Sequence, residues 1–159
     1  PARPHGRPVT EIQMADLLRE VRRRFDFCLL DAPAGLGRGF QLATCAADRC
    51  VVVTTADASS LRDAQRTVME LDRFPSGALH LVVNRVRKKL LRQLHATIDD
   101  AIDKAGLPLL GVVPEDDALP LCMNRGVPIL LADGQSAATA YRNIAKRLQG
   151  ERVPLLRIR

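Results

Sequence analysis

The chain has 159 residues, of which 47% are hydrophobic and only 3% aromatic, and it contains no tryptophan. This length is sufficient for one sizeable core, which has to be built from Leu, Val, Ile and Ala, as in buried parallel sheets. The sequence has no signal peptide and no apolar run of about 18 residues, so we expect a cytoplasmic protein without a transmembrane segment. The net charge of +6 would suit acidic partners such as nucleic acid or anionic lipid, but it establishes neither.

Hydrophobic periodicity predicts helices and strands that alternate along the chain. Thr10 and Gln13 have the spacing of a capping box, and helical periodicity then predicts a first helix over 10–24. A second capping box, Ser60 with Asp63, predicts the start of another helix. The predicted strands are 26–31, 49–54, 79–84 and 108–113, and the other predicted helices are 39–47, 59–73, 88–105 and 135–149.

This alternation is typical of right-handed βαβ units. The predicted fold class is therefore α/β, with a mainly parallel sheet and helices on both faces. Residues 10–150 form one predicted domain, whereas 1–9 and 151–159 are expected to be loosely held terminal segments.

The four cysteines are spread along the chain without the two-residue spacing of common zinc or redox motifs. A metal site built on them is therefore disfavoured. Cys28 and Cys50 occur in apolar runs, where cysteine behaves as a small hydrophobic residue. We expect reduced, buried thiols.

The run from Phe27 to Gly37 combines a predicted strand with a loop rich in proline and glycine. The strand places Asp31 at its carboxyl end, which is the edge where ligands bind in parallel α/β sheets. A carboxylate there is suited to a hydrated Mg²⁺ or to an attacking water. One alternative is that Asp31 only caps a turn. Another is that the glycines form a dinucleotide-binding loop, although their spacing departs from that fingerprint.

Polar residues also follow the third and fourth predicted strands. Asn84 and Arg85 end the third strand, and the fourth is followed by Pro114, Glu115 and Asp116. A side-chain amide can pair with the donor and acceptor groups of an adenine edge. The alternative is that Asn84 merely ends a strand and Pro114 merely makes a turn.

Together these motifs resemble the MinD/ParA branch of P-loop ATPases, and most closely its MinD members. The second nucleotide-binding motif of that family is a strand that ends in Asp-x-Pro-Ala-Gly, as at 31–35 here. The resemblance extends from about residue 25 to residue 150. The other matching runs, in family order, are Val51–Thr55, Ser59–Ala64, Val82–Arg85, Leu110–Asp116 and Asn124–Pro128.

The resemblance implies ATP and Mg²⁺ as cofactors. Asp31 would be the catalytic residue and would hold Mg²⁺ through water, while Pro33 and Gly35 would belong to the loop that senses the γ-phosphate. It also implies a homodimer and protein regulators of a cell-division or positioning system. The residues expected around the adenine base are Asn84, Arg85, Pro114, Glu115 and Asp116.

The phosphate-binding loop of this family, Lys-Gly-Gly-x-Gly-Lys-[Ser/Thr], has no counterpart in the sequence. The basic run over 1–8 contains prolines, which lack the N–H groups that hold a phosphate. We therefore expect the C-terminal part of an ATPase domain, inactive alone and completed by an N-terminal part or a partner. In the family, the strand before this loop lies between the segments matching 27–31 and 51–55, so these two strands are expected to face a gap.

Basic residues form two clusters. ParA-type proteins bind DNA non-specifically through basic surfaces, so DNA is a partner to consider, although solvated helix faces are the ordinary explanation. Two functions follow from the sequence: an ATP-hydrolysing switch that places the cell-division site or related machinery, or a non-catalytic module for protein interaction or nucleoid binding. The segment 155–159 is too short for the membrane helix that ends MinD. The clusters are Arg19, Arg22, Arg23 and Arg24, and Arg85, Arg87, Lys88, Lys89 and Arg92.

Overall fold

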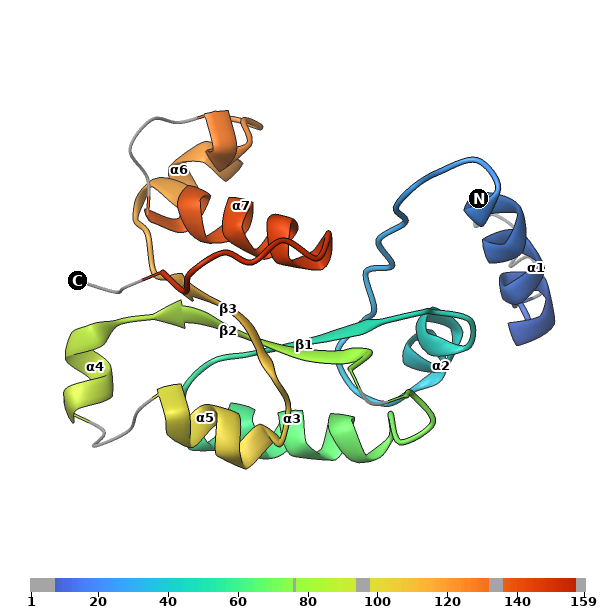
Figure 1. The fold of residues 1–159 in the computed structure, drawn as a ribbon, viewed down its shortest axis with the longest axis horizontal. Helices are drawn as coiled ribbons and strands as arrows, with labels where there is room; N and C mark the ends of the chain where they lie inside the picture. The colour runs from blue at the N-terminus through green and yellow to red at the C-terminus, as the bar shows by residue number, and fades with distance from the viewer. Residues whose placement is uncertain (1–7, 76, 94–97, 132–135, 157–159) are drawn as a thin grey trace, which may run out of the picture. The chain divides into compact units, whose positions relative to one another are not determined.

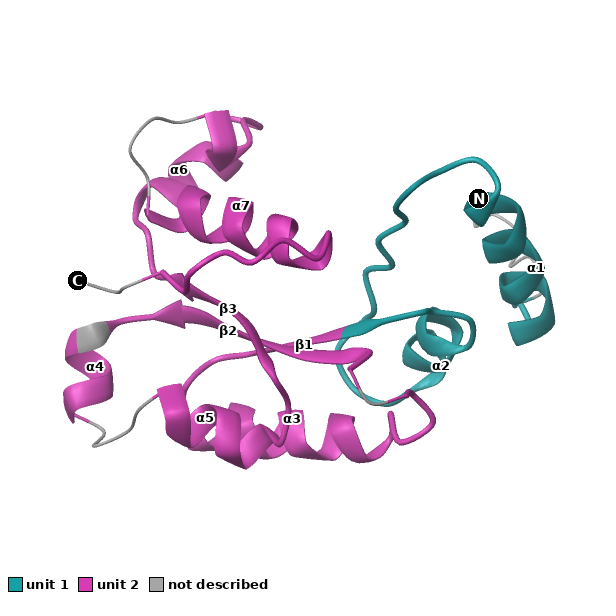
Figure 2. Ribbon diagram, in the orientation of Figure 1, with its two compact units in different colours: residues 1–50 teal, residues 51–159 magenta. Residues whose placement is uncertain are grey.

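A computed structural model of the protein describes residues 8–75, 77–93, 98–131 and 136–156. The chain divides into two compact units, residues 1–50 and residues 51–159 (Figure 2). Each unit is described below by itself. Among the described residues, no helix is both long and apolar enough to span a bilayer.

The second unit is built on a sheet in the order β1-β2-β3, formed by Cys50–Thr54, Leu79–Val86 and Leu109–Pro114. Strands β2 and β3 are parallel, as the alternation of strands and helices predicts. Helices α3 and α5 cover one face of the sheet, and α7 packs on β3 at the other face, so the α/β fold class is confirmed (Figure 1). The helices are α3 (Ala58–Met69), α4 (Lys88–Gln93), α5 (Ile98–Ala105), α6 (Ala118–Asn124) and α7 (Ser136–Leu148), with a 3₁₀ helix η1 at Ile129–Leu131.

The core of this unit is aliphatic, as the composition predicts. Leu81 and Val83 on β2 are fully buried, and β3 is buried along most of its length. Gly111 on β3 allows α7 to approach closely, because a Cβ atom there would overlap Ile144 Cγ1 and lie 2.9 Å from Ile144 Cδ1. This contact holds α7 against the sheet.

The helix predicted over 88–105 corresponds to α4 and α5, and the residues between them, 94–97, lie outside the described part. Helix α6 and η1 were not predicted. They follow β3, and η1 lies beside both α6 and α7. Leu119 and Cys122 of α6 and Ile129 of η1 face the core.

The start of α3 differs from the prediction. Asp57, rather than Ser60, is the N-cap, and its carboxylate accepts a hydrogen bond of 3.0 Å from the Ser60 N–H. The capping box between Ser60 and Asp63 is therefore wrong. Asp57 also accepts hydrogen bonds from the hydroxyls of Ser59 and Thr55. These bonds lower the pKa of Asp57, because they stabilise its charged form, and the bond from Ser59 has the largest effect.

The first unit contains α1 (Glu11–Arg22) and α2 (Arg38–Thr44). The capping box predicted for α1 is present: the Gln13 N–H donates to Thr10 Oγ1, and the Thr10 N–H donates to Gln13 Oε1. The Arg22 guanidinium donates to the Ala46 carbonyl at 2.6 Å and to the Asp48 carboxylate at 2.7 Å. These bonds join the end of α1 to the loop that follows α2.

The strand predicted over 26–31 is absent from the structure. The segment carries no ladder hydrogen bonds to described residues, and its apolar side chains are exposed, Phe27 to 64% and Leu29 to 89%. The expectation of buried cysteines is also wrong for Cys28, which is exposed, while Cys45, Cys50 and Cys122 are partly buried. A strand forms only when neighbouring backbone groups pair with its N–H and C=O groups, and no described segment pairs here.

The segment 151–156 is attached to the second unit through Arg147 of α7. The Arg147 Nε and Nη2 atoms donate to the Val153 carbonyl at 3.0 and 2.8 Å, and Nη2 also donates to the Pro154 carbonyl. From the same guanidinium, Nη1 donates to the Leu110 carbonyl of β3 at 2.8 Å. One arginine fork thus connects this segment, helix α7 and the sheet, and Leu156 packs beside the core.

Candidate functional site

Strand β2 has a left-handed residue next to its last position. Arg85 has φ +53°, which is uncommon for a residue with a side chain, and the register of β2 against β3 shifts between Val83 and Val86. The Asn84 side chain is partly buried, and its Oδ1 atom accepts a hydrogen bond of 2.9 Å from the Arg85 N–H. This bond uses the carbonyl oxygen of the amide in the protein and leaves the Nδ2 group as donor.

The end of β3 lies directly beside this bulge. The Glu115 N–H donates to the Val86 carbonyl at 3.1 Å, so the Pro114–Asp116 segment follows the same carboxyl edge of the sheet as Asn84. Pro114 is buried as the last residue of β3.

Glu115 joins the two strand ends by ion pairs. Its Oε1 atom lies 3.2 Å from Arg85 Nη2, and its Oε2 atom pairs with Arg87 Nε. The Glu115 side chain is only 21% exposed, although both arginines are largely in solvent. The hydrogen bond from Arg87, followed by that from Arg85, lowers the pKa of Glu115.

Asp116 has a role that the sequence reasoning missed. Its Oδ1 atom accepts from the Ala118 N–H at 3.1 Å, and its Oδ2 atom accepts from the Ala137 N–H at 3.1 Å and from the Ser136 hydroxyl at 3.3 Å. One carboxylate therefore satisfies backbone donors at the starts of α6 and α7. The position of Asp116 two residues before Ala118 is a capping signal that could have predicted half of this role.

Asp31, Pro33 and Gly35 lie in the first unit, in the exposed segment that leads to α2. Gly35 has φ +87°, a conformation that glycine adopts without strain, and the ring of Pro33 packs against Gly39 at the start of α2. The expected proline and glycine turn is present, but Asp31 follows an exposed segment rather than a buried strand. Within the second unit, the structure brings together the predicted residues at the ends of β2 and β3.

The described residues fit the base of a nucleotide better than its phosphates. The Asn84 amide at a sheet edge offers a donor that suits an acceptor atom of a base. Asp31 offers a single exposed carboxylate, which is compatible with a metal held through water, and the described residues contain no cluster of three acidic, His or Cys side chains. No glycine-rich loop with a lysine occurs in residues 1–159, so the triphosphate is without its expected donors.

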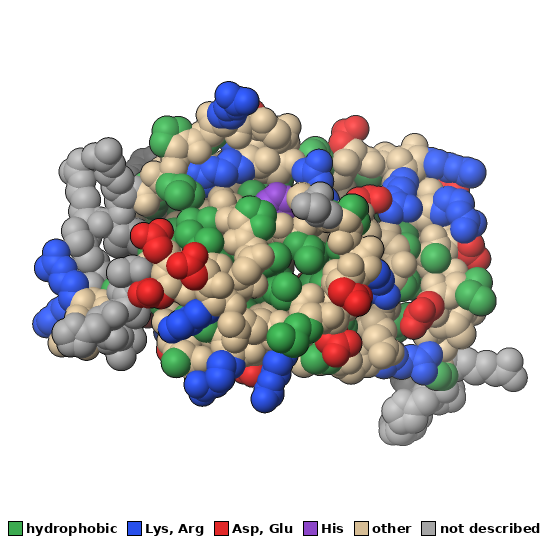
Figure 3. Space-filling view, turned by 60° about the horizontal axis from the view of Figure 1, so that its bottom comes forward, with side chains coloured by type: hydrophobic (Ala, Val, Ile, Leu, Met, Phe, Trp, Pro, Cys, Tyr) green, Lys and Arg blue, Asp and Glu red, His purple; other side chains and the backbone are tan. Residues whose placement is uncertain are grey.

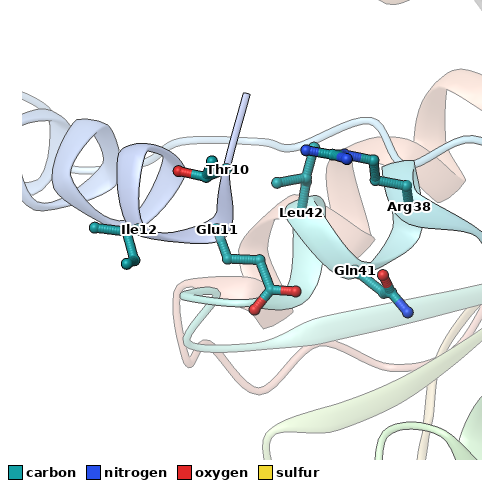
Figure 4. A pocket seen from close by; sticks show the side chains of 6 residues that line it. All are labelled: Thr10, Glu11, Ile12, Arg38, Gln41 and Leu42. Carbon is teal, nitrogen blue, oxygen red and sulfur yellow. The ribbon is translucent and has the colours of Figure 1, made fainter. Parts of the chain in front are cut away.

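The first unit also has an open hollow of ≈ 560 Å³. Figure 4 shows that its lining side chains come from the beginning of α1 and from α2, and none is a predicted site residue. Arg38, on its rim, donates to the Val9 carbonyl at 2.6 Å. The hollow is lined by Thr10, Glu11, Ile12, Arg38, Gln41 and Leu42.

The basic cluster at the end of α1 is balanced by acidic side chains. In the cluster on α1, Arg19 pairs with Asp16, Arg22 with Asp48, and both Arg23 and Arg24 with Glu20, so acidic groups offset the positive charge. On the side of the molecule in Figure 3, acidic and basic side chains are interspersed among hydrophobic ones. A continuous basic surface is not seen on that side.

The parallel sheet, its helical layers and the polar residues at adjacent strand ends define a protein of the MinD/ParA class with the P-loop NTPase fold. The chain belongs to the family described as "Cellulose biosynthesis protein BcsQ", whose sequence profile matches residues 5–148. This assignment confirms the resemblance recognised in the sequence.

Individual relatives agree with it. The chain is 34% identical over 147 residues to the septum site-determining protein MinD of Synechocystis and 37% identical over 145 residues to that of Bacillus subtilis. These alignments cover 91% and 90% of the chain but 55% and 54% of the relatives. The chain therefore spans about half the length of the curated relatives it matches.

Solved structures show the same relationship. The MinD cell division protein of Aquifex aeolicus superposes with a TM-score of 0.87 at 30% identity, covering 94% of this chain and 64% of that one. A MinC:MinD cell division protein complex from the same organism gives a TM-score of 0.88 at 30% identity, covering 95% and 63%.

Proposed function

We propose that this polypeptide is the base-binding and switch portion of a MinD-like ATPase that places the cell-division site or related cellular machinery. The observation that carries the proposal is the joined carboxyl edge of β2 and β3, where Asn84 and the Pro114–Asp116 segment lie side by side. In parallel α/β sheets this edge is where ligands bind. The family assignment and the MinD relatives support ATP as the ligand.

Each predicted residue has a proposed role in binding the nucleotide. Asn84 would donate to an acceptor atom of adenine, and Pro114 would form one wall of the base pocket. Asp31 would orient a water in the shell of Mg²⁺, while Pro33 and Gly35 would allow the following loop to change conformation. When bound, Mg²⁺ would neutralise charge on the phosphates. A MinD structure from Pyrococcus horikoshii is described as complexed with Mg-ADP, which supports both cofactors.

The donors for the phosphates would come from outside residues 1–159. Strand β1 has β2 as its only neighbour in the described sheet, so its other edge is open to a further strand. Val51 and Val53 are exposed on the same strand, and an added apolar strand would cover part of them. We propose that the polypeptide that carries the phosphate loop pairs along this edge.

Protein partners are proposed on the same basis. A homologous MinD is described in a MinC:MinD complex, which supports a protein regulator for this chain. A nucleotide-dependent homodimer is the assembly that we propose for the completed protein. Non-specific DNA binding remains the alternative function. It would use the cluster after β2, where Glu115 partly offsets Arg85 and Arg87.

Calorimetry with Mg-ATP tests the proposal in two polypeptides. Residues 1–159 alone should show no micromolar affinity, because base contacts without phosphate donors are weak. A polypeptide extended at its N-terminus by the natural coding sequence should bind. In that protein Asn84→Ala should weaken ATP binding and reduce discrimination against GTP, whereas Asp31→Ala should reduce turnover more than binding.

Three results would contradict the proposal: micromolar binding by residues 1–159, no binding by the extended protein, or unchanged base preference in the Asn84→Ala variant. DNA binding that is abolished by Lys89→Ala together with Arg92→Ala, in a protein without nucleotide affinity, would instead establish the non-catalytic alternative. Salt titration would separate that binding from specific recognition.

A further inference from the structure

The left-handed conformation of Arg85 requires an explanation, because a residue with a side chain pays free energy to adopt it. Such a conformation persists only when surrounding contacts hold it. Two contacts meet at this residue: its N–H donates to Asn84 Oδ1, and its guanidinium pairs with Glu115. The backbone of Arg85 is thus restrained by the preceding residue of β2, and its side chain by Glu115, which follows β3.

Glu115 is well suited to be the fixed point of this arrangement. It is held by its own backbone bond to Val86, it is partly buried, and each of its carboxylate oxygens pairs with a different arginine. Arg87 is the second arginine and lies beyond the bulge. The carboxylate therefore pairs with residues on both sides of Val86, where the irregular part of β2 ends.

We propose that Glu115 is the positioning residue of the base-binding edge: by pairing with Arg85 and Arg87 it holds residue 85 in the left-handed conformation, and through the Arg85 N–H it fixes the direction of the Asn84 carboxamide. The sequence resemblance placed Glu115 in the wall of the base pocket. In the structure both of its oxygens face protein cations instead, so it acts through Asn84. The part of this inference that concerns a base depends on the function proposed above, but the coupling of Glu115 to Asn84 does not.

A double-mutant cycle with glycine tests the coupling. Glycine adopts the left-handed region at no cost, so an Arg85→Gly chain should keep the bulge without help from Glu115. The measurement is NMR on ¹⁵N-labelled residues 1–159, following the Asn84 side-chain NH₂ signals and hydrogen exchange at the residue 85 amide. Glu115→Gln keeps the shape of the side chain and removes its charge.

In the otherwise unchanged chain, Glu115→Gln should shift the Asn84 NH₂ signals and accelerate exchange at the Arg85 amide by about tenfold. In the Arg85→Gly background the same substitution should change neither. Arg87→Gln should reproduce the effect of Glu115→Gln more weakly, since it removes one of the two pairs. Glu70→Gln, which removes an acidic charge at the end of α3, is the matched control and should leave the Asn84 signals in place.

Protection of the Val83 and Val112 amides reports whether the sheet is intact in each variant. Equal effects of Glu115→Gln in both backgrounds would overturn the proposal, because Glu115 would then contribute only general stability. An absence of any shift in the unchanged chain would also overturn it. AMP at millimolar concentration separates the two proposals: if AMP moves no Asn84 signal while the coupling holds, Glu115 positions Asn84 and the proposed base site is wrong.

Discussion

Two regions of the molecule carry similar sequence patterns but have different structures. Both 26–31 and 79–84 are apolar runs that end in a polar residue suited to bind a ligand. The second run is the core of β2, where Leu81 is 0% exposed, whereas the first is an extended exposed segment in which Leu29 is 89% exposed. The difference lies in neighbours: β2 has a strand on each side, and 26–31 has none among the described residues.

An apolar run therefore predicts the capacity to form a strand rather than the strand itself. The hydrogen bonds of a strand belong to its neighbours as much as to itself, and the burial of its side chains depends on layers that other segments provide.

The largest expected contrast comes from truncating one leucine in each region. Leu81→Ala should lower the free energy of unfolding by about 2–5 kcal/mol, because it removes buried methyl groups and leaves a cavity. Leu29→Ala should change it by less than about 0.5 kcal/mol, because that side chain is already in solvent. Urea denaturation of both variants checks this. A loss for Leu29→Ala comparable to that for Leu81→Ala would mean that 26–31 is packed in solution.

A second contrast uses glycines with different surroundings. Gly111→Ala should destabilise the second unit by about 1–3 kcal/mol, because the new methyl group would overlap Ile144 and push α7 from the sheet. Gly37→Ala places its methyl group in open space at the N-cap of α2, so its effect should be smaller. Thermal unfolding followed by circular dichroism compares them. Equal thermal midpoints for the two variants would show that α7 accommodates the new methyl group without loss of stability.

The N-caps of α3 and α1 provide a smaller contrast. Asp57→Ala should cost about 0.5–2 kcal/mol, because α3 packs in the core layer of the second unit. Thr10→Ala should cost less in global unfolding and appear mainly as fraying of α1, which is more exposed. Amide exchange at Ser60 and Gln13 measures the two effects locally. If neither amide exchanges faster in its variant, the capping roles of Asp57 and Thr10 are contradicted.

The Asp57 carboxylate also predicts a pH dependence with a definite sign. Its pKa is lowered in the folded protein, chiefly by the Ser59 hydroxyl, so its charge contributes stability above the unfolded pKa of about 3.9. That contribution is lost as the pH falls below this value toward the folded pKa. Asp57→Asn preserves a good N-cap but cannot titrate, so its stability should fall less between pH 5 and pH 2 (roughly, the range of carboxylate titration). An equal loss of unfolding free energy on acidification in both proteins would contradict this role of the Asp57 charge.

The smallest expected effect concerns the ion pair of the first unit. Arg22→Ala should cost at most about 1 kcal/mol, because the pair with Asp48 is exposed and screened. Most of the loss should come from the hydrogen bond to the Ala46 carbonyl. Exchange at the Asp48 and Arg49 amides, with Arg19→Ala as control, reports this local effect. A loss above 2 kcal/mol (about twice the surface-pair limit) would indicate that this loop supports more than α1.

Much of the fold could be predicted from the sequence because its signals are local. Apolar runs located β1, β2 and β3 within one or two residues, and Thr10 with Gln13 identified the start of α1. The same patterns placed Asn84 and the Pro114–Asp116 segment after two strands, and the structure shows that these strands are neighbours. The family resemblance followed from the order of these runs and is confirmed.

Other features depended on contacts between residues distant in the chain. The sequence alone determined the α/β class, the strand-end residues and the lack of a phosphate loop in residues 1–159. Only the tertiary structure decided that 26–31 stays unpaired, that Asp116 anchors α7, and that Glu115 pairs with Arg85 and Arg87. The physical reason is that periodicity and capping are properties of neighbouring residues, whereas pairing and burial are decided by which segments meet in space.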